Sequence, residues 1–507
     1  MSKGENQCPS IEGRRCHGAD QPHGGKPVGG STLRGRRLGI CCLAALIAVS
    51  MPAAALPPAP ASCATETLSR QQTRAALDAI TQHIRSAHYG SLEGIPPTLA
   101  TALATLRREA PPTMPAWKFA SAVNRALATA NDGHLALHLR ADVEAHCPRL
   151  PLAFTWGDSG LLLRSGATVP VGARVISVGG KSLLALQQEA VATIPHENVY
   201  WARAEMARQM TRLDGMLAYG LTANDGTVTV TFEGPEGTTQ SQRVATAEPS
   251  APPQDWISYK LFPERSTGLL RLSRMGDNQE ASGPLKEFFA GVIQNQIHKV
   301  VVDLRGNPGG DVSLAVAILG HLGQTKYESF SADIRASREL LDDQPRFDPE
   351  KIGPAFLAFG LKPPPAHATR FELPGPIVLA AIMQGLGAPP QEVATDRRLF
   401  LLVDGGTFSS AALFALLVRD NHLGLLVGEP VGTSTGFHGE EVDIRIPNLD
   451  YDLSVSTMQL DRPDRDAGLS PAILPDIFLP VTSSALASGK DEALDYVLRA
   501  DPLSIAP

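Results

Sequence analysis

Two adjacent serines are the residues of this chain best placed for nucleophilic chemistry. An apolar run at 401–403 is followed by Gly405-Gly406, then by Ser409-Ser410 and a series of small residues. A buried strand, a glycine turn and a helix in succession would lift a serine hydroxyl out of a sheet, beside the free N–H groups of the helix N-terminus. Such a hydroxyl could attack an acyl group. Taken alone, the pattern is explained more simply by a serine that caps the helix.

A second glycine loop favours the catalytic interpretation. Residues 303–310 read Asp-Leu-Arg-Gly-Asn-Pro-Gly-Gly, after an apolar run and before a predicted helix at 312–322. The exposed N–H groups of such a loop form a cradle for an anion, which suits a developing oxyanion. The loop has neither of the glycine patterns that bind nucleotide phosphates. Helix capping would leave this loop unexplained.

These two loops, in this order, resemble the signatures of the C-terminal-processing and tricorn-type serine peptidases, D-L-R-x-N-x-G-G and G-T-x-S-[AS]-[AS]. Segments 427–430 (Val-Gly-Glu-Pro) and 474–477 (Leu-Pro-Asp-Ile) resemble two further family segments. The resemblance covers about Asp255 to the end. It implies a crotonase-like α/β core, peptidase activity on peptide or protein substrates, and Ser409 as the nucleophile. It also implies oxyanion donors, namely Gly309, Gly310 and Ser410.

The general base separates the two branches of the family. The C-terminal-processing branch uses a lysine, but no lysine occurs between Lys362 and Lys490, which excludes the conventional Ser/Lys dyad. The tricorn-type branch uses a histidine in a D-G-H-x-x-L context, which His134 matches. An imidazole with an ordinary pKa near 6.5 can accept the serine proton at neutral pH. We therefore expect His134 to be the base, with His438 as the alternative or as a residue of the substrate cleft.

The acid that would orient the histidine is not evident. Tricorn-type enzymes place a serine beside the histidine and a glutamate downstream, but Gly133 replaces that serine and segment 464–471 departs from the glutamate pattern. Asp466, Glu440 and Glu441 are the candidate acids. Ordinary surface carboxylates would explain all three equally well.

The surrounding pattern predicts several domains. Apolar residues at three-to-four spacing predict a helical domain at 66–140. Short alternating runs predict a β-rich region at 148–246. Within it, 172–181 resembles a PDZ segment, and a generic β-hairpin explains that segment almost as well. Strands alternating with helices predict the α/β catalytic core at 255–485, with an excursion at 325–374, and a C-terminal helix and tail follow at 486–507.

The N-terminus predicts export. The segment has the order of a secretory signal peptide: basic residues (Arg34, Arg36 and Arg37), an apolar run at 38–49 and Ala53-Ala54-Ala55. Residues 1–55 are therefore expected to be leader and signal and 56–65 a linker. The apolar run is shorter than the roughly 20 residues that span a bilayer. We expect a periplasmic or secreted bacterial protein without a transmembrane span after signal removal. Cys63 and Cys147 could then form a disulfide, while a lipid anchor at Cys63 is the weaker alternative.

Composition limits the remaining functions. The net charge of −7 among 507 residues offers no basic excess for nucleic acid. No metal-binding motif occurs, so we expect neither a metal nor another cofactor. The sequence carries no signal for an oligomeric state. Two alternatives remain at this stage: a catalytically inactive ligand-binding protein with the same fold, or an esterase or amidase for small substrates.

Overall fold

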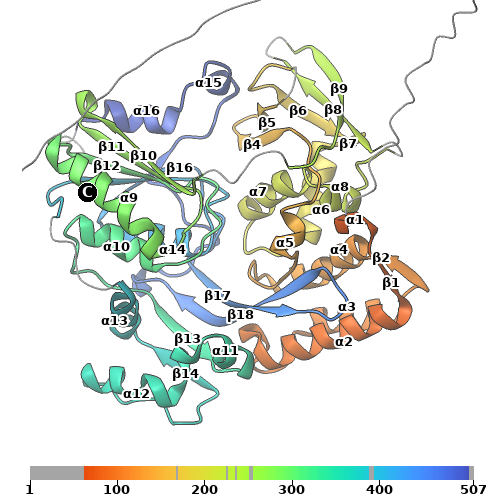
Figure 1. Ribbon diagram of the computed structural model, residues 1–507, viewed down its shortest axis with the longest axis horizontal. Coiled ribbons are helices and arrows are strands. Elements are labelled where there is room, and N and C mark those ends of the chain that lie inside the picture. The colour runs from red at the N-terminus through yellow and green to blue at the C-terminus, as the bar shows by residue number, and fades with distance from the viewer. Residues whose placement is uncertain are drawn as a thin grey trace, which may run out of the picture. The chain divides into compact units, whose positions relative to one another are not determined.

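The computed structural model describes residues 62–166, 169–223, 226–234, 237–249, 255–386 and 393–501. The predicted signal peptide and most of the predicted linker lie outside these residues, as does the tail after Asp501. The described chain is a mixed α/β structure with several sheets (Figure 1), which confirms the predicted class. The crotonase-like character of the core and the PDZ-like character of the middle region stay predictions.

The core sheet brings the two glycine loops together. Its strand order is β10-β11-β12-β15-β16-β19, with β10 antiparallel to β11 and the others parallel. Every residue of β12 is buried, as expected for a parallel strand covered on both faces. Since β12 and β15 are parallel neighbours, the loops that follow them emerge at the same edge of the sheet. The bounds of these strands are Ile257–Phe262, Thr267–Leu272, Lys299–Asp303, Arg398–Val403, Gly424–Gly428 and Ile477–Phe478.

Helices α9 (Asn278–Gln294), α10 (Ser313–His321), α13 (Gly375–Leu386) and α14 (Ser410–Asp420) accompany this sheet. Helix α9 begins at Asn278 and includes Pro284 in its interior. The reason for this start is a cap: the Asp277 carboxylate accepts hydrogen bonds from the N–H groups of Gln279 and Glu280. Two further helices, α15 (Ser483–Ala487) and α16 (Glu492–Arg499), complete the described C-terminal part.

A second sheet connects the core to the helical region. Its order is β14-β13-β18-β17, and β3 also pairs with β18. Figure 1 shows the long strands β17 and β18 running from the core toward α2. The excursion at 325–374 supplies β13 and β14 together with two helices. The bounds are β3 Ala136–Leu139, β13 Ser331–Arg335, β14 Arg370–Leu373, β17 Gly436–Arg445, β18 Tyr451–Asp461, α11 Arg338–Asp343 and α12 Pro349–Ala358.

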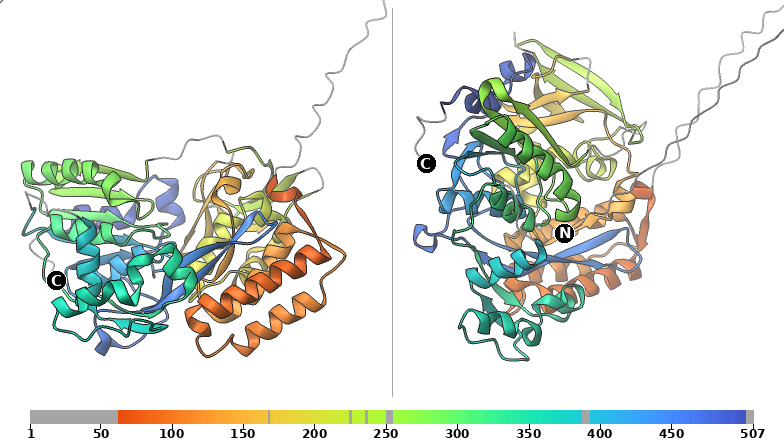
Figure 2. Two further views of the ribbon diagram at one scale, coloured as in Figure 1. Left: turned by 60° about the horizontal axis from the view of Figure 1, so that its bottom comes forward. Right: turned by 60° about the vertical axis from the view of Figure 1, so that its left-hand side comes forward.

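The helical region contains α2 (Arg70–Ala87), α3 (Pro97–Arg108) and α4 (Ala116–Leu127), with α2 and α3 side by side in Figure 2. Leu77, Ile80 and Ile84 of α2 are fully buried, as their spacing predicted. Short elements flank these helices, namely α1 Ser62–Thr65, β1 Thr67–Ser69, β2 Thr113–Pro115 and α5 Ala141–Glu144.

The middle region combines a sheet of order β4-β5-β6-β8-β9 with three helices (Figure 1). Strand β7 pairs with β6 outside this order. The connection between α6 and α7 contributes to the site described below. The bounds are β4 Ala153–Gly157, β5 Gly160–Ser165, β6 Arg174–Val178, β7 Lys181–Ser182, β8 Thr227–Glu233, β9 Thr239–Ala245, α6 Leu183–Thr193, α7 Val199–Gln209 and α8 Leu213–Ala218.

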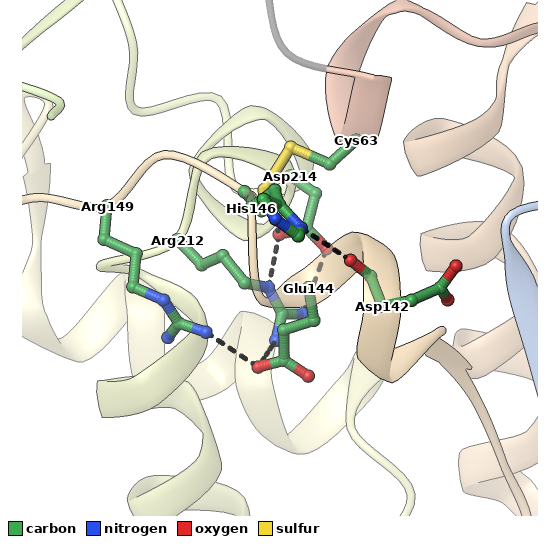
Figure 3. The surroundings of a disulfide bond; sticks show 8 residues. Cys63, Asp142, Glu144, His146, Arg149, Arg212 and Asp214 are labelled. Atoms are coloured by element: carbon green, nitrogen blue, oxygen red, sulfur yellow. Dashed lines mark hydrogen bonds and ion pairs between the residues drawn. A yellow bond between two sulfur atoms is a disulfide. The ribbon is translucent and has the colours of Figure 1, made fainter. Parts of the chain in front are cut away.

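A disulfide joins Cys63 to Cys147, the pair that the sequence left as a possibility. Beside it, the Arg212 guanidinium pairs with Asp214 and with Glu144 (Figure 3). The bond thus ties the start of the described chain to the end of the helical region. Within the described ranges, no helix is long and apolar enough to cross a membrane.

Candidate active site

Ser409 occupies a sharp turn between β15 and α14. Its backbone has φ 52° and ψ −125°, a conformation that is strained for a residue with a side chain. Although Ser409 stands at the N-cap of α14, its side chain makes no capping hydrogen bond to the described residues. Its N–H donates to the Thr433 hydroxyl at 3.2 Å. The capping explanation therefore does not account for Ser409, whereas a nucleophile turn does.

The two predicted loops meet at this serine. The Ser410 hydroxyl donates to the Gly310 carbonyl at 2.6 Å. Gly309 packs closely on the same turn: a Cβ built there would lie 2.6 Å from the Cβ of Ser409 and 3.0 Å from the N of Ser410. The structure thus brings Ser409, Ser410, Gly309 and Gly310 together.

The predicted oxyanion donors are not equivalent. The Gly309 N–H already donates to Asn307 Oδ1 at 2.9 Å. By contrast, the N–H groups of Gly310 and Ser410 have no acceptor among the described residues, and Ser410 stands in the first turn of α14, where N–H groups are free. Gly310 and Ser410 are therefore the available donors in this structure, and Gly309 shapes the loop.

A partly buried carboxylate connects the two loops. Asp404 Oδ1 accepts hydrogen bonds from the N–H groups of Gly306 at 2.8 Å and Gly406 at 2.9 Å. Burial raises the pKa of Asp404, and these N–H donors act against the increase. The Phe408 N–H donates to the Asn307 carbonyl at 2.9 Å, which adds a direct backbone link. The relative position of the loops is thus set by several hydrogen bonds.

His134 lies in a stack of four rings that includes Phe408, the residue before Ser409. Its imidazole is stacked on Phe408 with centroids 4.5 Å apart and on Phe437 at 5.6 Å. On its other face, Phe408 stacks on Trp201 at 3.9 Å. The helical region, the middle region, the core loop and β17 therefore meet at this stack, which holds His134 beside the nucleophile turn.

Three carboxylates control the charge of His134. Its Nδ1 lies 3.8 Å from Glu197 Oε1, and neither ring nitrogen has a hydrogen-bond partner among the described residues. Burial lowers the pKa of His134, but Glu197, Glu441 and Asp132 outweigh this effect and raise it to about 9. The raised pKa favours the protonated imidazole at neutral pH, and the ring could accept a proton only after losing this one.

A hydrogen-bonded cluster lies behind the histidine loop. Asp132 Oδ2 is 3.0 Å from His88 Nε2 and 3.3 Å from His438 Nδ1, and it also accepts from the Ser456 hydroxyl. Asp132 Oδ1 accepts the His134 N–H at 2.8 Å. Burial alone would raise the pKa of Asp132, but the two histidines hold it well below its ordinary value. His438, our alternative base, is thus a partner of Asp132.

The acids proposed from the sequence lie in different settings. Asp466 is exposed in a short turn of helix, and Glu440 pairs with Arg346 at 3.1 Å. Glu441 is exposed on β17 and acts on His134 through its charge. Glu197, the carboxylate nearest to the imidazole, was absent from our candidates. It stands in the α6–α7 connection, where no sequence signal marked it.

Two groups of side chains have the spacing of metal ligands. The ligand atoms of His88, Asp132 and His438, and those of Asp132, His134 and Glu197, lie within 4.8 Å of one another. Hydrogen bonds already account for the first group, and the second is the surroundings of His134 described above. Neither group requires a metal to explain its geometry.

A cavity of 410 Å³ adjoins the site. Gly133, beside His134, and Pro308, beside Gly309, both line it, together with Trp201. The cavity therefore reaches the loop of the proposed base and the loop of the oxyanion donors.

Residues 266–477 match the sequence profile of Peptidase family S41. The chain carries a domain of this peptidase family. The match indicates a hydrolase of the peptidase type. The S41 domain contains both glycine loops and Ser409, while His134 and Glu197 precede it in the chain. A search of curated proteins finds no significant match.

Solved structures support the fold. Mature CPAF is similar with a TM-score of 0.60 at 16% identity, over 85% of this chain and 97% of that chain. Mature CPAF complexed with lactacystin has a TM-score of 0.59 at 18% identity, over 85% of this chain and 98% of that chain. The photosystem II D1 C-terminal processing protease has a TM-score of 0.41 at 14% identity, over 86% and 98% of the two chains. At these identities, the two CPAF structures bear on the fold of this chain and not on its substrate.

Proposed function

We propose that this protein cleaves peptide bonds through an acyl-enzyme, with Ser409 as nucleophile and His134 as general base. The observation that carries the proposal is the strained turn at Ser409, whose side chain does not cap α14. Strain of this kind costs about 1–3 kcal/mol and is common at catalytic residues. The same turn lies against Gly309, in the loop implied to bind the oxyanion.

In the proposed reaction, neutral His134 takes the proton of the Ser409 hydroxyl as the oxygen attacks the substrate carbonyl. The negative charge that develops on the carbonyl oxygen is stabilised by the N–H groups of Gly310 and Ser410. Protonated His134 then gives its proton to the leaving amine. Water attacks the acyl-enzyme by the same path and restores the Ser409 hydroxyl.

We also propose that the protein is exported. The order of basic, apolar and small residues in 1–55 supports this proposal, as does the Cys63–Cys147 bond, because disulfides persist in oxidising compartments. Detection of the mature chain outside the cytoplasm of the producing cell would support it. Retention of an unprocessed chain in the cytoplasm would contradict it.

The nucleophile is tested by labelling with a fluorophosphonate probe, which reacts with activated serines. We expect the wild type to label, Ser409→Ala to lose labelling, and Ser410→Ala to retain most of it. Ser410 is the matched control because it is adjacent and its N–H survives the substitution. Within the described part of the chain, its hydroxyl bonds only to the Gly310 carbonyl. Labelling that persists in Ser409→Ala would refute the assignment.

The reaction is tested with an unstructured protein and a small ester as parallel substrates. Cleavage of the protein by the wild type, and not by Ser409→Ala, supports the peptidase. Turnover of the ester alone would favour the esterase alternative. A wild type that neither labels nor cleaves would contradict the proposed catalytic site.

A further inference from the structure

The histidine proposed as base is buried beside a carboxylate from a different part of the chain. The side chains of His134 and Glu197 are 2% and 4% exposed, and His134 Nδ1 lies 3.8 Å from Glu197 Oε1. Glu197 comes from the α6–α7 connection of the middle region, outside the S41 domain. We propose that Glu197 is the positioning residue that orients His134 and stabilises its protonated form during catalysis.

Gly133 makes this approach possible. Its N–H donates to Glu197 Oε1 at 2.9 Å, which anchors the carboxylate to the histidine loop. A Cβ built at Gly133 would lie 3.2 Å from Glu197 Oε2 and 2.8 Å from Cζ of Phe408. Gly133 stands where the resembling family has a serine. The missing side chain thus leaves space that Glu197 and the Phe408 ring occupy.

Glu197 also has capacity left for this role. Its Oε2 is buried and has no hydrogen-bond partner among the described residues, and the same holds for both nitrogens of His134. Buried polar atoms without partners are costly, so such a pair is rarely retained without a reason. Catalytic hydrogen bonds are often long before substrate binds and shorten in the complex. A small approach of the imidazole would turn the 3.8 Å ion pair into a hydrogen bond.

The other charged groups near His134 are less suited to the role. Glu441 of β17 is exposed and acts only through its charge. Asp132 uses Oδ1 for the His134 backbone N–H and Oδ2 for His88, His438 and Ser456. His438, when protonated, repels the positive charge of a protonated His134 and therefore opposes its protonation. Of these groups, only Glu197 has a carboxylate oxygen, Oε1, beside a ring nitrogen of His134, while its other oxygen, Oε2, has no partner among the described residues.

The test rests on the proposed function and uses the rate of fluorophosphonate labelling as a function of pH. Glu197→Gln keeps the shape of the side chain and an oxygen for the Gly133 N–H, but it removes the charge. We expect the maximal rate to fall at least about 10-fold, because the protonated imidazole loses its partner. The rising limb of the profile should also move to lower pH, since the carboxylate no longer favours the proton. Glu197→Asp should recover part of the rate.

Glu441→Gln is the matched control. At 1 M salt the screening length is about 3 Å, so the exposed Glu441 should have little influence on the rising limb of the pH profile. The effect of Glu197 on this limb should remain, because its side chain is buried. A purely structural role of Glu197 would lower the melting temperature without moving the limb. If the wild type labels and Glu197→Gln has an unchanged profile, the inference is refuted while the function stands. If Glu441→Gln lowers the labelling rate and shifts the rising limb at 1 M salt instead, the positioning role of Glu197 is also refuted. A wild type that never labels refutes the proposed function itself.

Discussion

Gly309 lies so close to Ser409 that a Cβ built on the glycine would be 2.6 Å from the Cβ of the serine. Gly309 also has φ 105°, which disfavours any residue with a side chain. A glycine at this position therefore permits the backbone conformation of its own loop and leaves room for Ser409, the proposed nucleophile.

Gly309→Ala should reduce the labelling rate by about 10² or more, since a displacement near 1 Å at a reacting group can cost that much. Gly306→Ala is the control in the same loop: φ there is 72°, but a Cβ would meet nothing within 4 Å. Both variants should lose about 1–3 kcal/mol of stability through backbone strain. Only Gly309→Ala should lose labelling. Equal labelling of the two variants would contradict the close packing.

Replacing Phe408 should separate the role of the ring stack from ordinary packing. Phe408→Leu removes the face on which His134 rests at 4.5 Å. Phe289→Leu removes a comparable contact elsewhere in the core, where the rings of Phe289 and His321 stack with centroids 4.6 Å apart. We expect each to lower the free energy of unfolding by about 1–3 kcal/mol, measured by denaturant titration. Labelling should fall in Phe408→Leu only, and a similar fall in both would argue against a specific stack.

The stability of the protein should respond to Glu429. Burial raises the pKa of Glu429 to about 7, with a further increase from the charge of Asp404. Because the unfolded chain ionises near 4.5 and the folded chain near 7, the unfolded state binds fewer protons between these values. Stability from this group is therefore present below pH 4.5 and lost as the pH rises to 7. Glu429→Gln should melt like the wild type near pH 4 and be more stable by up to about 3 kcal/mol at pH 8. A constant difference across this range would contradict the raised pKa.

The disulfide should contribute to stability and little to catalysis. Cys63 and Cys147 are separated by 84 residues, so opening the bond releases a long loop in the unfolded chain. The double variant Cys63→Ser/Cys147→Ser should lose about 2–4 kcal/mol in denaturant unfolding. Reductant should lower the wild type to the same level and leave the variant unchanged. Labelling below the melting transition should persist, and its loss would connect the bond to the site.

The sequence alone determined the parts of the site that are local. A buried strand followed by glycines and a helix specifies its own turn, so the loops at 303–310 and 404–409 could be recognised from residue types. The structure adds the reason why the two loops meet, which is the parallel pairing of β12 and β15. The absence of lysine between Lys362 and Lys490 favoured His134 as the base. The sequence also offered the Cys63–Cys147 disulfide as a possibility, and the structure contains it.

Only the tertiary structure decided which groups surround His134. Glu197 follows Gly133 by 64 residues, and their contact depends on how the α6–α7 connection packs against the histidine loop. No periodicity or motif encodes that packing. The Gly309 N–H is a second example. The family resemblance implied that it is an oxyanion donor, but in the structure it already donates a hydrogen bond to Asn307 Oδ1. Local patterns specify turns and elements because neighbouring residues control the backbone, whereas the partners of a buried charge are chosen by the fold as a whole.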